Sequence, residues 1–120
     1  MNLKLKPSLR EKRHYLLIKV NSEKDLDEKE IKEKIKKAIF EFIGILGYAN
    51  AGPIFIDIED ENLKKEMKSK KMIVLSVTTK FVKHVKAALI LSKEKNFSLD
   101  CIRVSGTLKK IKDFIKEMKD

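Results

Sequence analysis

The sequence predicts an α+β fold in which helices pack against a four-stranded antiparallel sheet. Four short stretches rich in Ile, Leu and Val have the length of strands, and three longer segments repeat apolar residues at helical spacing. Hydrophobic residues make up 42% of the 120 residues, so a core is available without a disulfide or a structural metal. We therefore expect one domain that spans residues 1–120.

The first half of the chain is expected to hold an arm, a strand and a helix. Residues 1–12 read as an extended basic arm, because Pro7 disfavours a helix there. Residues 14–20 are nearly continuous in Leu, Ile and Val, which predicts a central strand buried on both faces. A long helix follows, with Asp25 as its expected N-cap and Gly47 as its C-cap. Its expected core face is Ile31, Ile35, Ala38, Ile39, Phe42, Ile43 and Leu46.

The second half is expected to contribute three more strands and two more helices. The strands are residues 54–58, 72–77 and 97–104. The charged stretch 59–70 is interpreted as a hairpin loop, with room for a short helical turn. Thr78 or Thr79 is expected to cap a second helix, with Phe81, Val85, Ala88 and Leu89 on its core face. The terminal helix is very basic, with a core face of Leu108, Ile111, Ile115 and Met118.

This order predicts a ferredoxin-like, or RRM-like, βαββαβ sandwich with an additional C-terminal helix and a basic N-terminal arm. Both crossover helices of such a fold lie on one face of the sheet. Apolar residues such as Leu17 and Val74 are expected on the other face. Either the terminal helix or a protein partner must cover that face.

The charge balance predicts a polyanionic partner. Lys and Arg total 28 against 18 Asp and Glu, a net charge of +10, so nucleic acid, an anionic membrane surface and an acidic protein are the candidates. The N-terminus lacks a signal-peptide pattern, and no apolar run is long enough to span a bilayer. The one cysteine, Cys101, is interpreted as a small buried side chain, which fits a reducing cytosol. We expect a cytoplasmic chain with no membrane role.

The first candidate RNA-binding segment is the end of the arm. Arg10, Lys12 and Arg13 offer positive charges to phosphates, and Tyr15 offers a ring for stacking on bases. The alternative interpretation is a solvated basic tail that leads into a strand.

The second candidate segment is a turn from a strand directly into a helix. Ser105, Gly106 and Thr107 form this turn, where backbone N–H groups and the helix dipole attract anions. Lys109 and Lys110 add charge near the helix start. The alternative is that Ser105 or Thr107 simply caps the helix, which is compatible with phosphate binding.

The sequence contains no convincing catalytic constellation. The acidic residues between positions 57 and 61 are a weak candidate for a divalent ion, and a charged loop explains them more simply. His14 and His84 lie far apart in the chain, and no nucleophile is paired with a base. We therefore expect this chain to be non-catalytic and to bind no cofactor or metal.

The two basic segments resemble the ribonuclease P protein component 2 family of archaea, whose eukaryotic relatives are shared by ribonuclease P and the MRP particle. The matching stretches are LKLKPSLREKRHY at residues 3–15, GILG at residues 44–47 and VSGTLK at residues 104–109. The resemblance covers nearly the whole chain. These stretches are modest singly and fairly specific together in a basic chain of this length.

The resemblance implies an RRM-like subunit of ribonuclease P that binds the ribonuclease P RNA, pairs with protein component 3 and works beside other protein subunits. The holoenzyme would remove the 5′ leader from precursor tRNA as an endonuclease. Its RNA would supply the active site and hold the magnesium ions. Relatives often carry an arginine in the third strand and another in the second helix. This chain has Val74-Leu75-Ser76 and Val85-Lys86-Ala87 there, so only the helix keeps a charge.

Two alternatives stay open. The first is a generic ferredoxin-like RNA-binding module, which would bind unrelated structured RNAs equally well. The second is a small-molecule-binding domain on the same fold, which a ligand-sized apolar pocket would support.

Overall fold

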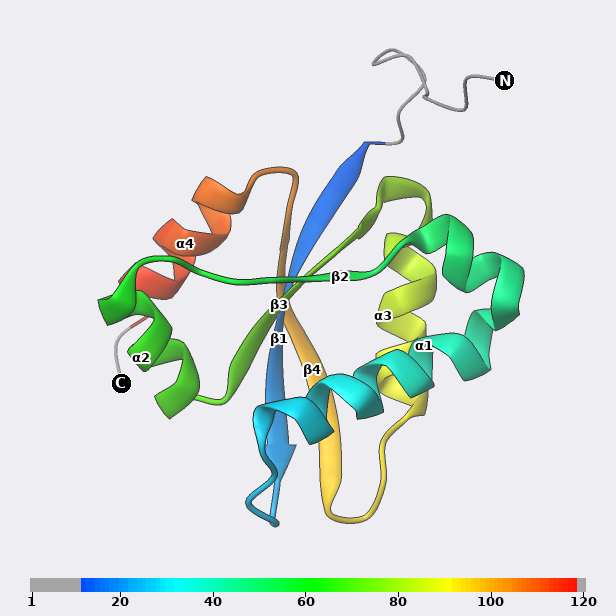
Figure 1. Ribbon diagram of the computed structural model, residues 1–120, viewed down its shortest axis with the longest axis horizontal. Helices are drawn as coiled ribbons and strands as arrows, with labels where there is room; N and C mark the ends of the chain where they lie inside the picture. Colours follow the sequence, from blue (N-terminus) through cyan, green and yellow to red (C-terminus); the bar gives the residue numbers. More distant parts are fainter. Residues whose placement is uncertain (1–11, 119–120) are drawn as a thin grey trace.

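The computed structural model describes residues 12–118, which form four strands and four α-helices in alternation (Figure 1). The strands are β1 (Arg13–Ser22), β2 (Ile54–Ile56), β3 (Met72–Thr78) and β4 (Phe97–Ser105). The helices are α1 (Glu28–Ala51), α2 (Glu61–Ser69), α3 (Val82–Leu91) and α4 (Leu108–Glu117), and a short 3-10 turn, η2 (Thr79–Phe81), precedes α3. Most of the expected arm, including Arg10, lies outside the described residues.

The four strands form one sheet in the order β2-β3-β1-β4, with every neighbouring pair antiparallel. β1 is central, as predicted: it pairs with β3 from Arg13 opposite Thr78, and with β4 from Tyr15 opposite Ser105. This order places the ends of β3 and β4 on either side of the start of β1. The predicted ferredoxin-like fold class is confirmed.

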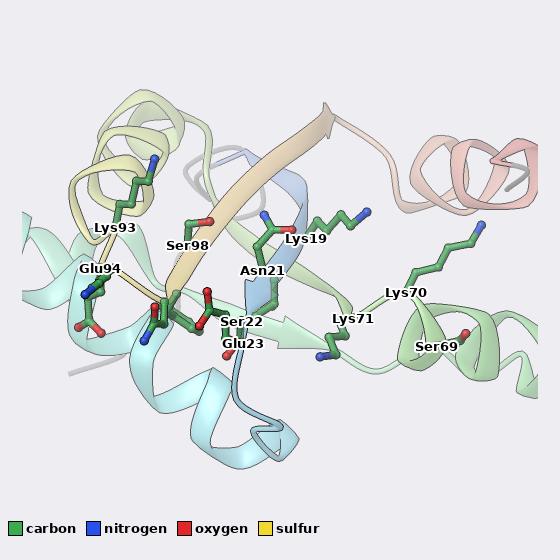
Figure 2. Close-up of a pocket in the computed structure, with 14 residues that line it drawn as sticks. Lys19, Asn21, Ser22, Glu23, Ser69, Lys70, Lys71, Lys93, Glu94 and Ser98 are labelled. Carbon is green, nitrogen blue, oxygen red and sulfur yellow. The ribbon is translucent and has the colours of Figure 1, made fainter.

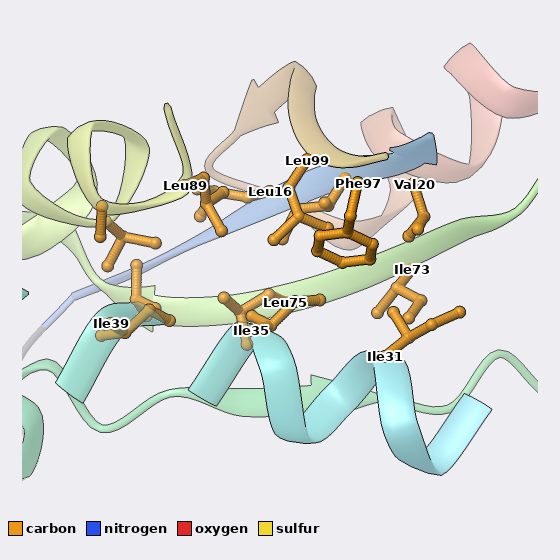
Figure 3. Packing of buried hydrophobic residues seen from close by; sticks show 14 residues of the cluster. Leu16, Val20, Ile31, Ile35, Ile39, Ile73, Leu75, Leu89, Phe97 and Leu99 are labelled. Carbon is orange, nitrogen blue, oxygen red and sulfur yellow. The ribbon is translucent and has the colours of Figure 1, made fainter. Parts of the chain in front are cut away.

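Helices cover both faces of the sheet (Figure 1). On one face, β1 and β3 pack against α1 and α3, and Figure 3 shows Ile31, Ile35 and Ile39 of α1 beneath the sheet. The other face forms a second core in which α2 and α4 bury Leu17, Val74, Leu63, Met67, Ile111 and Ile115. The question left open by the sequence is thus answered: the terminal helix covers this face, together with a helix that the sequence did not predict.

That helix, α2, corrects the expectation of a loop at residues 59–70. The Asp60 side chain caps it by accepting the backbone N–H groups of Asn62 and Leu63. Leu63 and Met67, one helical turn apart, are buried in the second core. The strand before it is shorter than expected, since β2 ends at Ile56.

The ends of α1 also differ from the prediction. Asp27, rather than Asp25, caps the helix by accepting the N–H of Glu30 at 2.8 Å. Gly52 at φ 53°, rather than Gly47, closes it. Gly44, at φ 74° and ψ −177°, kinks the helix. Past this kink Leu46 is 79% exposed instead of lying in the core, whereas Tyr48 packs against the first core and Ala51 is buried.

The second crossover helix lacks the predicted side-chain cap. Neither Thr78 nor Thr79 caps η2 or α3, and the Thr78 hydroxyl donates instead to the carbonyl of Asn50. Val85, Ala88 and Leu89 are buried as expected, while Phe81 is only partly covered. No helix within residues 12–118 is long and apolar enough to cross a membrane.

Candidate nucleic-acid interface

The two predicted RNA-binding segments meet at one end of the sheet. Because β3 and β4 both run antiparallel to β1, their last residues flank its first ones. Tyr15 lies opposite Ser105 on β4 and opposite Ser76 on β3. Two strand-to-helix turns therefore border the start of β1, and they lead into α3 on one face and α4 on the other (Figure 1).

The turn at residues 105–107 is built by its own hydroxyl groups. The Thr107 side chain caps α4 by accepting the N–H of Lys110 at 3.3 Å. The buried Ser105 hydroxyl accepts the N–H of Thr107 at 3.2 Å. Thr107 therefore has the capping role considered for it, whereas Ser105 holds the turn before the helix and does not cap α4. This arrangement leaves Lys109 and Lys110 exposed at the positive end of the helix dipole, where an anion is favoured.

Gly106 keeps the outer side of this turn open. A Cβ atom at Gly106 would have only one neighbour outside its own chain segment, the Nε2 atom of His14 at 3.8 Å, which is ordinary van der Waals contact. No backbone of the described protein approaches closely enough to require a glycine. The free space is therefore available to a backbone from outside the chain, such as that of a nucleic acid.

His14 joins this turn to the one between β3 and α3. Its Nδ1 atom lies 2.7 Å from the Thr79 hydroxyl, and its Nε2 atom faces Gly106. The N–H of Thr79 donates to the carbonyl of Lys12 at 2.8 Å. Sequence reasoning treated Thr79 only as a cap and gave His14 no role. The pairing of β1 with β3 brings these residues together, and no local pattern in the sequence signals it.

Arg13, a predicted RNA contact, is engaged by the protein itself. Its Nε donates to the Ser76 hydroxyl at 2.8 Å, and its Nη2 donates to the Ser76 carbonyl at 2.9 Å and to the Gly52 carbonyl. The guanidinium therefore ties the start of β1 to β3 and to the end of α1. Ser76, in the strand segment where relatives often carry arginine, is buried and serves Arg13. An RNA contact by Arg13 stays a prediction.

The other candidates are placed as follows. Lys12 is exposed beside the 78–82 turn. Tyr15 is partly buried and packs against the second core on the α4 side, so only part of its ring faces outward. Stacking by Tyr15 and phosphate contacts by Lys12 remain predictions.

The groups considered for other chemistry have structural partners. Within residues 12–118, no three His, Cys, Asp or Glu side chains lie together as a metal site would require. Asp60 caps α2, and Asp57 pairs with Lys64 at 3.3 Å. Cys101 is half-buried rather than fully buried, and it packs against the first core. This burial raises the pKa of its thiol, although Lys86 acts in the opposite direction.

A sequence model of the Rpp14/Pop5 family matches residues 14–116. The chain belongs to this family. It is 34% identical to ribonuclease P protein component 2 of Methanocaldococcus jannaschii, over 90% of this chain and 75% of that protein. It is 36% identical to the component 2 protein of Thermococcus gammatolerans, over 90% and 86%, and 35% identical to that of Pyrococcus abyssi, over 93% and 92%. The resemblance inferred from the two basic segments is confirmed.

The fold has a counterpart among solved structures. A chain in the structure of yeast ribonuclease MRP superposes with a TM-score of 0.56, over 93% of this chain and 91% of the other. Sequence identity is 12%, so this likeness concerns the fold alone.

Proposed function

We propose that this chain is a protein subunit of ribonuclease P that binds the enzyme's RNA and supports removal of the 5′ leader from precursor tRNA. The main support for this proposal is that the start of β1 lies beside the 105–107 turn. There, exposed lysines, an open glycine and the starts of two helices face outward together. The net charge of +10 favours association with RNA, and membership of the Rpp14/Pop5 family supports this particular RNA.

The proposal divides the work between RNA and protein. The RNA carries the cleavage chemistry and its magnesium ions, and this chain contributes contacts to phosphates and sugars that hold the RNA in its active shape. Candidate contacts are Arg10, Lys12, Arg13, Tyr15, Ser105, Gly106, Thr107, Lys109 and Lys110. No catalytic side chain and no cofactor of its own is assigned to the chain. Its proposed location is the cytoplasm.

The proposal includes protein component 3 and other ribonuclease P proteins as partners. The layer formed by α1 and α3 exposes six large apolar side chains, with exposed fractions of 44–79%: Phe40, Phe42, Ile45, Leu46, Ile90 and Leu91. Such a concentration of apolar surface supports a protein partner on this layer. It lies on the opposite face of the sheet from α4, so the RNA-binding turn at residues 105–107 stays accessible.

Reconstitution tests the proposal. The host's ribonuclease P RNA, component 3 and a labelled precursor tRNA are combined at low magnesium with and without this chain. We expect the chain to increase the rate of 5′ leader removal, because neutralised phosphates lower the magnesium needed to fold the RNA.

A double variant, Lys109→Ala/Lys110→Ala, should lose much of this stimulation, whereas Lys65→Ala/Lys68→Ala removes the same charge from exposed positions of α2, away from this turn and from the α1–α3 layer, and should keep it. Equal cleavage with and without the chain would reject the proposal. Equal affinity for unrelated structured RNAs, with no stimulation, would favour the generic RNA-binding module.

A further inference from the structure

A basic groove of about 590 Å³ lies at the far end of the sheet from the interface described above (Figure 2). It is formed where β1 ends and where β3 and β4 begin. Figure 2 shows lysine side chains reaching it from β1, from the end of α2 and from the loop after α3. Five lysines line it, against the two glutamates Glu23 and Glu94: Lys19, Lys70, Lys71, Lys93 and Lys95.

One of these lysines is bound by other groups of the protein, and the other four are exposed to solvent. Lys70 is held by the Glu66 carboxylate at 3.1 Å and by the Met118 carbonyl at 3.0 Å, so it belongs to the fold. On the acidic side, Glu94 lies 3.8 Å from Lys34, outside the groove. The remaining four groove lysines are exposed, and no ion pair engages them within residues 12–118. The groove is therefore positively charged, and its four exposed lysines can contact an anionic ligand.

Lys71 stands at a backbone position that does not suit lysine. At φ 56° it is the sole non-glycine residue with positive φ within residues 12–118. It directly follows Lys70, the C-cap of α2, where glycine is the usual residue because a Cβ atom is disfavoured in the left-handed region. Its backbone is well used, since its carbonyl accepts the N–H of Val20 at 2.8 Å. Folding needs this backbone and not this side chain, which indicates another role for the side chain.

We propose that this groove is a second RNA-binding site, and that its ligand is the phosphodiester backbone of the ribonuclease P RNA. The inference rests on the function proposed above. The lining favours RNA over an acidic protein: Ser98 adds a hydroxyl for phosphates and sugar hydroxyls, and the apolar members Val20 and Phe97 are buried. A protein interface would instead expose an apolar centre. The amide of Asn21 donates to the Asp100 carboxylate at 2.6 Å, so it belongs to the fold.

The two sites lie at opposite ends of β1. Tyr15 marks one end and Asn21 the other, and six residues of strand span about 20 Å. A chain that holds RNA at both ends of its sheet fixes the distance and orientation between two RNA segments. This is a positioning role, and the RNA keeps the chemistry.

Lys71→Gly tests the groove without weakening the fold. Glycine suits φ 56°, so the melting temperature should be equal to or above that of the parent protein. Affinity for the host's ribonuclease P RNA should fall about four- to five-fold at 0.15 M salt, and the log–log salt slope by about 0.7–0.9, as expected for one lost phosphate contact. Lys19→Gln, on β1, should act similarly. Lys37→Gln removes one charge from the outside of α1 and should change neither quantity.

The outcomes separate the inference from the function on which it rests. If both groove variants bind RNA with the affinity and salt slope of Lys37→Gln, the groove is not an RNA site, whether or not the chain stimulates cleavage. If the groove variants lose affinity while the parent protein fails to stimulate cleavage, the groove stands as an RNA site and the proposed function fails. A lower melting temperature for Lys71→Gly would contradict the structural argument for that lysine.

Discussion

At the scale of single residues, Arg13 shows how a charge expected to meet RNA is used inside the protein. Its planar guanidinium reaches the hydroxyl and carbonyl of Ser76 and the carbonyl of Gly52 at the same time. A lysine ammonium carries the same charge but cannot reproduce this fork of donors. The geometry therefore gives Arg13 a role in stabilising the fold, and the attraction of RNA by its charge stays a prediction.

Arg13→Lys should lower the free energy of unfolding by about 1–3 kcal/mol, because hydrogen bonds from a charged donor to β3 and α1 are lost. The salt slope of RNA binding should stay as it is, since the charge is retained. Urea unfolding measures the first quantity, with Lys12→Gln as an exposed neighbour that should cost little. Unchanged stability would mean that the guanidinium is not a structural clamp.

Thr107 and Arg13 show which side-chain contacts can be predicted from the sequence. Thr107 as the cap of α4 was predictable, because its partner is the N–H of Lys110, three residues away. The hydrogen-bond partners of Arg13 are 63 and 39 residues away in the chain, so no local sequence pattern predicts them. His14 and Thr79 are likewise 65 residues apart and meet only because β1 pairs with β3.

At the scale of elements, the last turns of α1 depend on two glycines. Gly44 breaks the helical conformation, and Gly47 lies against the preceding turn: a Cβ atom at Gly47 would be 2.7 Å from the Cβ of Ile43. That distance is too short for two carbon atoms. Gly47 is therefore required by the kink, and not by a helix end as the sequence suggested.

Gly47→Ala should destabilise the protein. In an ordinary helix interior this change stabilises by about 0.5–1 kcal/mol, so a loss of stability reverses the usual sign. Thermal unfolding measures it, and Ala49→Gly, on an exposed site of the same segment, should cost the ordinary amount. A stabilised Gly47→Ala variant would indicate that α1 continues past Gly44 without a kink.

Periodicity predicted the elements that have enough apolar residues to show a period. It identified all four strands and the helices α1, α3 and α4 for that reason, although β2 is shorter than predicted. It missed α2, whose nine residues contain only two buried side chains, Leu63 and Met67, among charges. Their burial depends on β3 and α4, which come later in the chain. It also extended the core face of α1 to Leu46, because a helical period does not take account of the kink at Gly44.

At the scale of the whole molecule, the candidate RNA site at one end of the sheet was predictable from the sequence, and the one at the other end was not. The start of β1 and the 105–107 turn were each visible as basic segments beside a predicted strand, and an antiparallel sheet brings them together. The groove at the other end draws its lysines from positions 19 to 95. Each of those lysines resembles an ordinary solvated charge in the sequence, so only the fold reveals the groove.

The two faces of the molecule also differ, and this supports a protein partner on one of them. α2 and α4 close the second core, whereas the α1–α3 layer exposes large apolar side chains. Leu46→Asp should leave the melting temperature nearly unchanged, because the side chain is 79% exposed. Binding of component 3, followed by calorimetry, should weaken by tenfold or more, on the order of the loss expected when an apolar contact becomes a buried charge.

Ile54→Asp is the matched control, since Ile54 is 53% exposed on the edge strand β2 and lies outside the α1–α3 layer. It should bind component 3 as the parent protein does. Equal weakening by both variants would place the partner elsewhere, and no weakening by Leu46→Asp would leave this layer without its proposed role. With the partner on that layer, the 105–107 turn stays open to RNA because it leads into α4 on the other face of the sheet. In the groove, Lys19 and Lys71 stay open because they lie at strand ends, whereas Lys93 adjoins Leu91 of the partner layer.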